Sequence, residues 1–548
     1  MVNEAVFSQL NAVGTPKLLG CQGQNDKSAG SVAASEYASE EASEEASKSK
    51  VTRDEEQRQQ SAMAQLSPNR PDATPSTPTA ATTQQPKFVT GSTLKHVINM
   101  TAAGSVGLIA VFAVDVLNLF YISLLGQKEL TSAVGYASTL LFFMLSLAIG
   151  LSIAVAALTS RAIGRGDREQ AKRLAGASLV WMVGSTALAS AVLFPFLPAA
   201  LQLLGASEVT AEFALRLSRI LLPSAPLLAA GICLAALLRS VGDARRAMYV
   251  TLGAGLAAAV LDPLFIFALG WGLDGAALAT VVARFVMLGV GLHGVLRVHK
   301  LYARPNAATL RATFKPFFAI GLPAVLTQVA TPVGNAFVTR AMGPFGDSAV
   351  AGWAVVGRIT PVAFAVVFAL SASVGPILGQ NLGAQRFERV RSTMNDSLKL
   401  VLVYVLAVWG VLALSSPFIA DAFQAEGAGR DVIVFFCTFV AGSFVFNGAM
   451  FVANAAFNNL GFPLYSTALN WGRATLGVLP FIWWGGTHYG ARGVLAGSGL
   501  GVVMFGVAGV WLCFRVMRNL ESKNAPVAAS LQGAEAEVIA SAQHNPLP

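Results

Sequence analysis

The chain is 548 residues long, and 54% of them are hydrophobic while only 12% are charged. Soluble domains carry about 25% charged residues. A composition this apolar, with a mean hydropathy of +0.59, therefore excludes a soluble globular fold and predicts an all-α integral membrane protein. The net charge of +9 does not indicate a nucleic-acid partner, because the basic residues stand in short clusters between apolar runs.

Residues 1–92 differ from the rest of the chain and are rich in Ser, Ala, Glu, Gln, Pro and Thr. A segment of this kind cannot bury enough apolar surface to offset the entropy of ordering. It is too acidic for a transit peptide and lacks the apolar stretch of a secretory signal. We predict a disordered cytoplasmic tail here and a second disordered tail over residues 521–548.

From about residue 98, apolar stretches of about 20 to 28 residues alternate with short polar breaks, and a membrane span needs about 20 apolar residues. The pattern predicts twelve transmembrane helices, of which the fourth is the least regular because it contains Arg216 and Arg219. The expected spans cover residues about 98–124, 133–159, 174–200, 213–238, 247–270, 274–298, 314–341, 349–377, 394–420, 433–458, 464–485 and 491–516.

Lysine and arginine are distributed unevenly over the breaks between these spans. The break after the second span runs from Arg161 to Arg173 and is strongly basic, as are those after the fourth, sixth and eighth spans. The alternate breaks, which hold Lys128, Asp274 and Asp347, are poor in basic residues. Short loops rich in Lys and Arg stay in the cytoplasm, so both termini are expected there. The Ala- and Gly-rich composition is compatible with a bacterial inner membrane.

The two halves of the chain repeat short features in the same order. Gly164 matches Gly383, and Gly242 matches Gly461 at the same spacing. We therefore expect two six-helix lobes, over residues 93–310 and 311–520. Because six is an even number, both lobes cross the membrane in the same direction, and a pseudo-twofold axis along the membrane normal should relate them. In transporters that are built from two such halves, the binding site lies between the halves. Rocking of the halves opens it to each side of the membrane in turn.

Several stretches between about residues 95 and 520 carry motifs in an order that resembles the MATE (multidrug and toxic compound extrusion) family. Each is a loose pattern, but together, on twelve spans with a duplicated half, they are specific. The resemblance implies efflux of bulky organic cations and similar compounds in exchange for protons or sodium. The stretches are Asn118–Gly126, Gly150–Ser160, Gly164–Glu169, Arg239–Asp243, Leu261–Phe267, Gly275–Thr280, Gly321–Pro323 and Gly379–Ala384.

Asp115 and Asp262 are acids that fall deep inside predicted spans. Inserting an ionisable side chain into a membrane span costs about 2.5 to 3.5 kcal/mol unless the group is paired or hydrated, so each acid is a functional candidate. A deprotonated acid attracts a cationic compound or sodium, whereas a protonated one is neutral and lets the site reorganise. The alternative is an acid that only holds helices together. Asp262 stands at the family's Asp-Pro position in span five, and Thr280 resembles a threonine of the same network.

Asn118 is a departure from the family pattern, which usually has an acid at this position. Asp115 lies one helical turn earlier on nearly the same face. We expect Asp115 to take over the role of the acid, with Asn118 supplying a hydrogen bond. Ala258, one turn before Asp262, replaces an Asn of some members. Because a hard cation needs several oxygen ligands, these losses favour proton over sodium coupling.

Polar residues within the other spans are the candidates for lining a substrate cavity, with ordinary interhelical hydrogen bonding as their alternative role. Arg284, one turn after Thr280, is placed to pair with Asp262, and Arg473 also lies well inside its span. Thr331 stands where some members of the family carry a glutamate. The cavity candidates are Arg284, Gln328, Asn335, Arg358, Asn447 and Asn454.

The sequence thus predicts a monomeric secondary antiporter for small organic molecules, with a lipid-linked oligosaccharide flippase of related architecture as the alternative. A flippase should have a strongly cationic cavity, whereas acids and arginines are mixed here. Neither the five histidines nor the four cysteines form a metal, nucleophile or disulfide motif. We therefore expect no enzyme activity, no metal and no cofactor other than the coupling ion.

Overall fold

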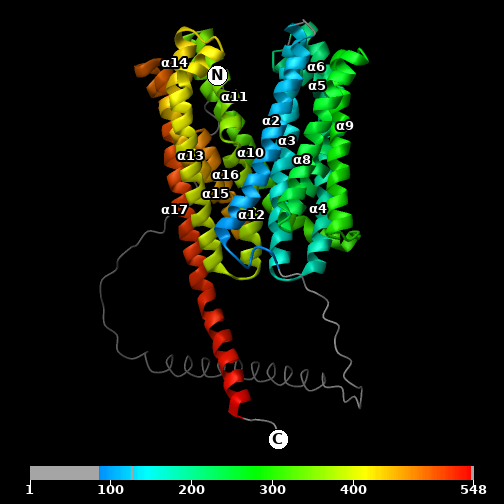
Figure 1. Ribbon diagram of the computed structural model, residues 1–548, viewed down its shortest axis with the longest axis vertical. Coiled ribbons are helices and arrows are strands. Elements are labelled where there is room, and N and C mark those ends of the chain that lie inside the picture. The colour runs from blue at the N-terminus through cyan, green and yellow to red at the C-terminus, as the bar shows by residue number, and fades with distance from the viewer. Residues whose placement is uncertain (1–85, 125–127, 206, 545–548) are drawn as a thin grey trace, which may run out of the picture. The chain divides into compact units, whose positions relative to one another are not determined.

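The computed structural model describes residues 86–124, 128–205 and 207–544, which belong to a compact unit that extends from Thr82 to Pro548. This part of the chain is almost entirely helical and contains no strand among the described residues (Figure 1). The predicted tail of residues 1–85 lies outside the described residues. Residues 86–92, in contrast, are placed and hydrogen-bonded, so the predicted end of the disordered tail at residue 92 is wrong.

The first group of helices covers the predicted N-terminal lobe. Prolines interrupt it at Pro195 and Pro223, where short 3-10 segments join consecutive α-helices, because proline cannot donate the backbone hydrogen bond that a helix interior needs. The α-helices are α2 (Thr93–Ser123), α3 (Lys128–Gly164), α4 (Arg168–Leu193), α5 (Leu197–Leu203), α6 (Glu208–Leu221), α7 (Ala225–Ser240), α8 (Ala244–Pro263) and α9 (Gly272–Leu292). The short elements are η1 (Phe194–Phe196), η2 (Leu222–Ser224), η3 (Leu264–Ala268) and η4 (His293–Val298).

The second group covers the predicted C-terminal lobe. The expected eighth span is broken at Phe364, three residues after Pro361, into two helices. The α-helices are α10 (Ala307–Met342), α11 (Asp347–Ala363), α12 (Ala365–Gly383), α13 (Phe387–Ala422), α14 (Gly427–Phe435), α15 (Phe444–Leu460), α16 (Pro463–Ala474) and α17 (Leu479–His544). The short elements are η5 (Gly343–Phe345), η6 (Phe436–Val440) and η7 (Ala441–Ser443).

Eleven stretches of the described chain are long and apolar enough to cross a membrane. The last of them, 60 residues from Pro463 to Ser522, contains both the eleventh and the twelfth predicted spans. The chain folds back on itself at Gly490, whose φ of +62° is not helical. Glycines on the two arms then face each other closely, as Gly477 does with Gly501. The fold of twelve spans is therefore confirmed, with one reversal inside the last helical stretch.

Beyond this point α17 continues to His544. The segment from residue 521 was predicted to be disordered, and that prediction is wrong as far as residue 544. The reason is local, because the segment is rich in alanine and glutamate, which favour a helix even without apolar surface to bury.

The two groups of helices meet through α2 and α3 on one side and α10 and α12 on the other. Small residues allow this close packing: Gly150 of α3 lies against Val325 of α10, and Gly104 of α2 lies against Ala369 of α12. In Figure 1 the ribbons of the two groups draw apart toward the end that carries α5, α6 and α14. The helices that carry the predicted site residues therefore include those that form the interface between the groups.

Candidate functional site

A buried carboxylate lies between α8 and α2. Asp262, in the last turn of α8, is only 1% exposed. Its Oδ2 accepts a hydrogen bond of 3.0 Å from the Nδ2 of Asn118 on α2. Its Oδ1 is buried without a hydrogen-bond partner among the described residues. Buried polar atoms are nearly always partnered, so this oxygen is a place where a proton or a cation can bind.

The helix that carries Asp262 changes form at this carboxylate. Pro263 follows directly, and the next five residues, Leu264–Ala268, form a π-helical turn. Proline removes one backbone donor, and π-helical turns are frequent at functional sites. The Asp-Pro pair therefore joins a titratable group to a deformable point in α8.

Of the four predicted coupling residues, Asn118 and Asp262 are in contact in the structure, whereas Asp115 and Thr280 lie apart from Asp262. Asp115 lies one turn earlier on α2 with an exposed side chain, and no hydrogen bond to it is formed within the described part of the chain. The hydroxyl of Thr280 donates to the carbonyl of Ala276 in its own helix, at 3.0 Å. Direct contact with Asp262 is thus shown for Asn118 and for neither Asp115 nor Thr280.

Arg284 does not pair with Asp262, and that expectation is wrong. Its guanidinium is nearly buried and donates to the carbonyl of Leu221, at 2.9 Å, and to the hydroxyl of Ser224. These two residues flank Pro223, where the helix between α6 and α7 is interrupted. Arg284 therefore bonds to the backbone and the side chain on either side of this interruption, a contact that sequence spacing along α9 could not reveal.

The candidates in the second group of helices are distributed over α10, α11 and α15. On α10, Gln328 is partly buried and Asn335 is exposed, and on α11 Arg358 is exposed. On α15, Asn447 is partly buried. Asn454 is 9% exposed, and its Oδ1 accepts from the Nδ2 of Asn470 at 3.1 Å.

A second set of polar contacts, which the sequence analysis did not select, joins the two groups of helices at one end. Arg161, near the end of α3, donates to the carbonyls of Asn458, at 3.1 Å, and Asn459 in the last turn of α15. Gln380, near the end of α12, donates 2.7 Å to the carbonyl of Ser240 in the last turn of α7. We call these contacts the interlobe clamp.

The interlobe clamp is reciprocal. The spacing that relates Gly164 to Gly383 also relates Arg161 to Gln380 and Ser240 to Asn459, so equivalent residues of the two halves bond to each other's helix ends. A Cβ on Gly164 would collide with the backbone of Gln380, and one on Gly383 would collide with the carbonyl of Arg161. The duplicated glycines were visible in the sequence, but their purpose as contact points between the halves was not.

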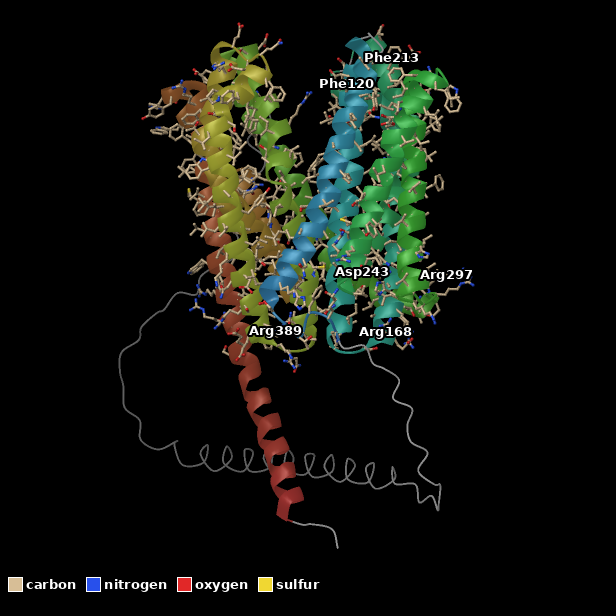
Figure 2. The ribbon with its side chains drawn as sticks, viewed as in Figure 1. Phe120, Arg168, Phe213, Asp243, Arg297 and Arg389 are labelled. Carbon is tan, nitrogen blue, oxygen red and sulfur yellow. The ribbon has the colours of Figure 1, made fainter. Side chains whose placement is uncertain are left out.

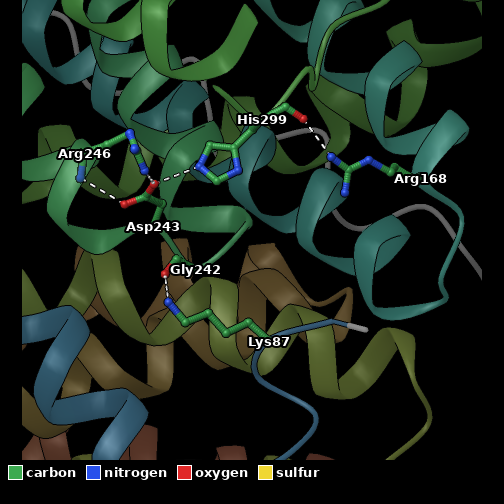
Figure 3. A network of polar contacts seen from close by, with 6 residues as sticks. All are labelled: Lys87, Arg168, Gly242, Asp243, Arg246 and His299. Carbon is green, nitrogen blue, oxygen red and sulfur yellow. Dashed lines mark hydrogen bonds and ion pairs between the residues drawn. The ribbon is translucent and has the colours of Figure 1, made fainter. Parts of the chain in front are cut away.

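Residues 86–92 lie across the same end. The amide of Phe88, a residue only 1% exposed, donates 2.9 Å to the Oε1 of Gln380, and its carbonyl accepts 2.8 Å from Arg389. Lys87 donates 2.7 Å to the carbonyl of Gly242, at the end of α7 (Figure 3). This segment therefore bonds to both groups of helices, and Gln380 is shared between it and α7.

Next to this contact is a network around Asp243, the N-cap of α8 (Figure 3). Its Oδ2 lies 2.6 Å from the Nη1 of Arg246 and 2.8 Å from the Nε2 of His299, whose carbonyl accepts 2.7 Å from Arg168. Burial acts to raise the pKa of Asp243, but the hydrogen bonds from His299 and Arg246 outweigh it and hold the pKa below its ordinary value. The network ties the beginnings of α4 and α8 to His299, just after the end of η4.

Comparison with known proteins gives consistent matches. The MatE family model matches residues 105–264 and 323–484. A FAD transporter from Shewanella oneidensis is 28% identical over 435 residues, which cover 78% of this chain and 96% of that protein. The multidrug export protein MepA from Staphylococcus aureus is 22% identical over 378 residues, or 67% of this chain and 81% of that protein.

Solved structures show the same fold. The Vibrio cholerae MATE transporter VcmN in its bent form superposes with a TM-score of 0.74 at 26% identity, over 78% of this chain and 98% of that one. A MOP superfamily transporter from Pyrococcus furiosus superposes with a TM-score of 0.73 at 22% identity, over 80% and 99% of the two chains.

Proposed function

Because the chain belongs to the MatE family, whose members are multi-pass membrane transporters and not enzymes, we propose that it is a secondary active exporter. It exchanges protons for organic compounds by alternating access. The buried pair of Asp262 and Asn118 is the observation that carries this proposal. Asp262 is an acid inside a span with one oxygen unpartnered, which is what a proton-coupled carrier needs at its coupling site.

In this mechanism Asp262 alternates between a carboxylate, which accepts the hydrogen bond from Asn118, and a neutral acid. A carboxylate at this depth is stable only with a partner or with water, so loss of its charge removes the constraint that holds α8 beside α2. Pro263 and the π-helical turn after it give α8 a place to bend when that happens. Asp115, one turn away on α2, would carry the proton between Asp262 and solvent.

The coupling ion is proposed to be a proton and not sodium. Next to Asp262, the amide of Asn118 is directed at the carboxylate through its nitrogen. Ala258, one turn earlier on α8, offers no oxygen ligand from its side chain. A sodium ion needs several oxygen ligands, as other hard cations do, whereas a proton needs one.

We infer the orientation of the protein in the membrane from the distribution of its basic side chains. Arg168, Arg297 and Arg389 lie at one end of the helices, whereas Phe120 and Phe213 lie at the other (Figure 2). Under the positive-inside rule, we assign the basic end to the cytoplasm of a bacterial inner-membrane protein with both termini inside. The interlobe clamp then closes the cytoplasmic side, and the compound would be released on the opposite side. We expect the transporter to function as a monomer.

The proposed cargo is a bulky organic compound. MepA is a multidrug export protein by name, and the Shewanella relative is a FAD transporter by name. These names support drug-like compounds and flavin nucleotides as candidate substrates.

The test is efflux of ethidium from cells that express the wild type, Asp262→Asn or Asp115→Asn, with and without a protonophore. We expect export by the wild type, its collapse with the protonophore, and its loss in Asp262→Asn at normal expression. Normal export by Asp262→Asn would show that this acid does not couple transport. Export that the protonophore leaves unchanged would refute proton exchange. Exposed Asp421→Asn, at the end of α13 in the second group of helices, is the matched control.

A further inference from the structure

The eleventh span is broken in its middle, and an arginine stands at the break. α16 ends at Ala474, Thr475 leaves the helical conformation with φ −109° and ψ −78°, and α17 begins at Leu479. Arg473 lies ten residues after Pro463, or about 15 Å along the helix at about 1.5 Å per residue. The hydrocarbon core is about 30 Å thick. The guanidinium of Arg473 is therefore carried at about half the depth of the membrane.

Arg473 lacks a counter-charge. Its Nη2 donates 3.2 Å to the hydroxyl of Thr331 on α10, and its Nε is buried without an acceptor. No ion pair to it is formed among the described residues. A guanidinium inside a span almost always pairs with an anion or faces a water-filled path. The acids of the described second group are engaged elsewhere or lie where helices begin. Asp421, Asp431 and Glu521 pair with other arginines, and Asp396 accepts a hydrogen bond from Thr93. Asp347, Glu388 and Glu426 lie at the beginnings of α11, α13 and α14.

The surface beside Arg473 faces the other half of the protein. On α10, Gly321 and Val325 pack against Leu151 and Gly150 of α3. Gln328 and Asn335 lie beside that face of α10, whereas Thr331 is turned further toward α16, where it accepts the hydrogen bond from Arg473. Thr331 and Asn335 are exposed although they lie well inside α10. A hydroxyl that accepts a hydrogen bond from a guanidinium is not directed at lipid, so Thr331 and Asn335 mark a polar surface of α10 beside Arg473.

We infer that Arg473, oriented by Thr331, binds a negatively charged group of the transported compound. The inference rests on the proposed transport function and adds organic anions to the class of compounds that the carrier binds. The compound would carry a carboxylate, sulfonate or phosphate on an aromatic or apolar body. A guanidinium fork whose Nη2 is already fixed loses little entropy on binding such a group. Gln328 and Asn335, one turn on either side of Thr331, supply further hydrogen bonds.

In this arrangement, proton coupling and substrate binding involve different halves of the carrier. The acids Asp115 and Asp262 stand on α2 and α8 of the first half and handle the proton, whereas Arg473 stands on α16 of the second half and holds the cargo. The occupant is a soluble organic anion and not a phospholipid headgroup, because headgroups lie at the membrane surface and Arg473 lies about 15 Å below it.

The test uses flavin mononucleotide and riboflavin, which share the same ring system and differ by one phosphate. Binding to the full-length protein in nanodiscs of zwitterionic lipid is measured by equilibrium dialysis. We expect the wild type to prefer flavin mononucleotide, and Arg473→Gln to lose that preference by about 10- to 100-fold, as for removal of a hydrogen bond to a charged group. Arg473→Lys keeps the charge and should retain part of it.

Thr331→Val should weaken flavin mononucleotide binding without removing it, and exposed Arg515→Gln, on α17, is the matched control that should leave it unchanged. Equal binding of the two flavins by the wild type, or an unchanged preference in Arg473→Gln, would overturn the inference. Loss of the phosphate preference when anionic lipid is added would assign the site to a lipid headgroup instead. Phosphate-selective binding combined with export that a protonophore leaves unchanged would retain the anion site and reject proton coupling.

Discussion

Gln380→Leu is a substitution that should open the cytoplasmic end of the protein. In the structure the side chain of Gln380 is fully buried, accepts 2.9 Å from the amide of Phe88 and donates 2.7 Å to the carbonyl of Ser240. Leucine has a similar volume but cannot form either bond. The amide of Phe88 and the carbonyl of Ser240 would then be buried without partners whenever the two halves are closed at this end.

The size of the effect follows from these two groups. A buried donor or acceptor that loses its partner costs about 1 to 3 kcal/mol, so the closed state is destabilised by about 2 to 6 kcal/mol. In the open state water reaches both groups, and the cost disappears. Because about 1.4 kcal/mol corresponds to a factor of ten, the equilibrium should shift toward the open state by at least about 30-fold.

The assay is a distance measurement by double electron–electron resonance. Spin labels are placed on cysteines introduced at Glu169, in the first turn of α4, and at Arg386, just before α13, after replacement of the native cysteines. Both positions are exposed and lie on opposite halves. Gln380→Leu should move population from the short distance of the closed state to longer distances. A distribution identical to that of the wild type would refute the role of Gln380, and Gln202→Leu, exposed at the opposite end, is the control.

Three further predictions concern the same end of the protein. Arg161→Met should lengthen the distance between the same two spin labels, because Arg161 donates to the carbonyls of Asn458 and Asn459. Arg161→Lys should lengthen it less. An unchanged distance distribution in Arg161→Met would contradict this prediction. Gly383→Ala should also favour the open state, because the added Cβ would collide with the carbonyl of Arg161. Alanine by itself favours the helix, so the collision acts against a local gain. A distance distribution that stays closed would show that the two backbones move apart slightly instead. Asp243→Asn should lower stability at pH 7 by about 1 kcal/mol. Because the folded-state pKa of Asp243 is lowered, its contribution is complete above about pH 4 and is lost as the pH falls through that lower pKa. Thermal unfolding of the two proteins at several pH values checks this, and a difference that persists in acid would count against the hydrogen bonds from His299 and Arg246.

The sequence was sufficient to predict the twelve spans, because they depend on the length of apolar runs. The symmetry of the two halves stays a prediction from repeated spacing. The sequence also selected Asn118 and Asp262 as coupling residues, but it expected Asn118 to support Asp115 and did not predict the hydrogen bond from Asn118 to Asp262. It did not predict the contacts that depend on how distant helices meet. Arg284 was expected at Asp262 from its spacing along α9, yet it bonds to the helix break at Pro223.

The interlobe clamp was hidden for the same reason. The sequence revealed that Gly164 and Gly383 correspond, but a glycine repeat does not say what the neighbouring backbone touches. The end of the disordered tail was placed at residue 92 because residues 86–92 have little apolar surface apart from Phe88 and Val89. Their order comes from hydrogen bonds to Gln380 and Arg389, which lie far along the chain.

Proton coupling through Asp262 is the central claim, and proton release on substrate binding tests it most directly. Purified wild type and Asp262→Asn in weakly buffered solution are mixed with ethidium or flavin mononucleotide while a pH-sensitive dye reports released protons. If substrate and proton exclude each other, the wild type should release protons on binding and Asp262→Asn should bind substrate without releasing any. Equal release by both proteins, or binding by the wild type without release, would contradict the account.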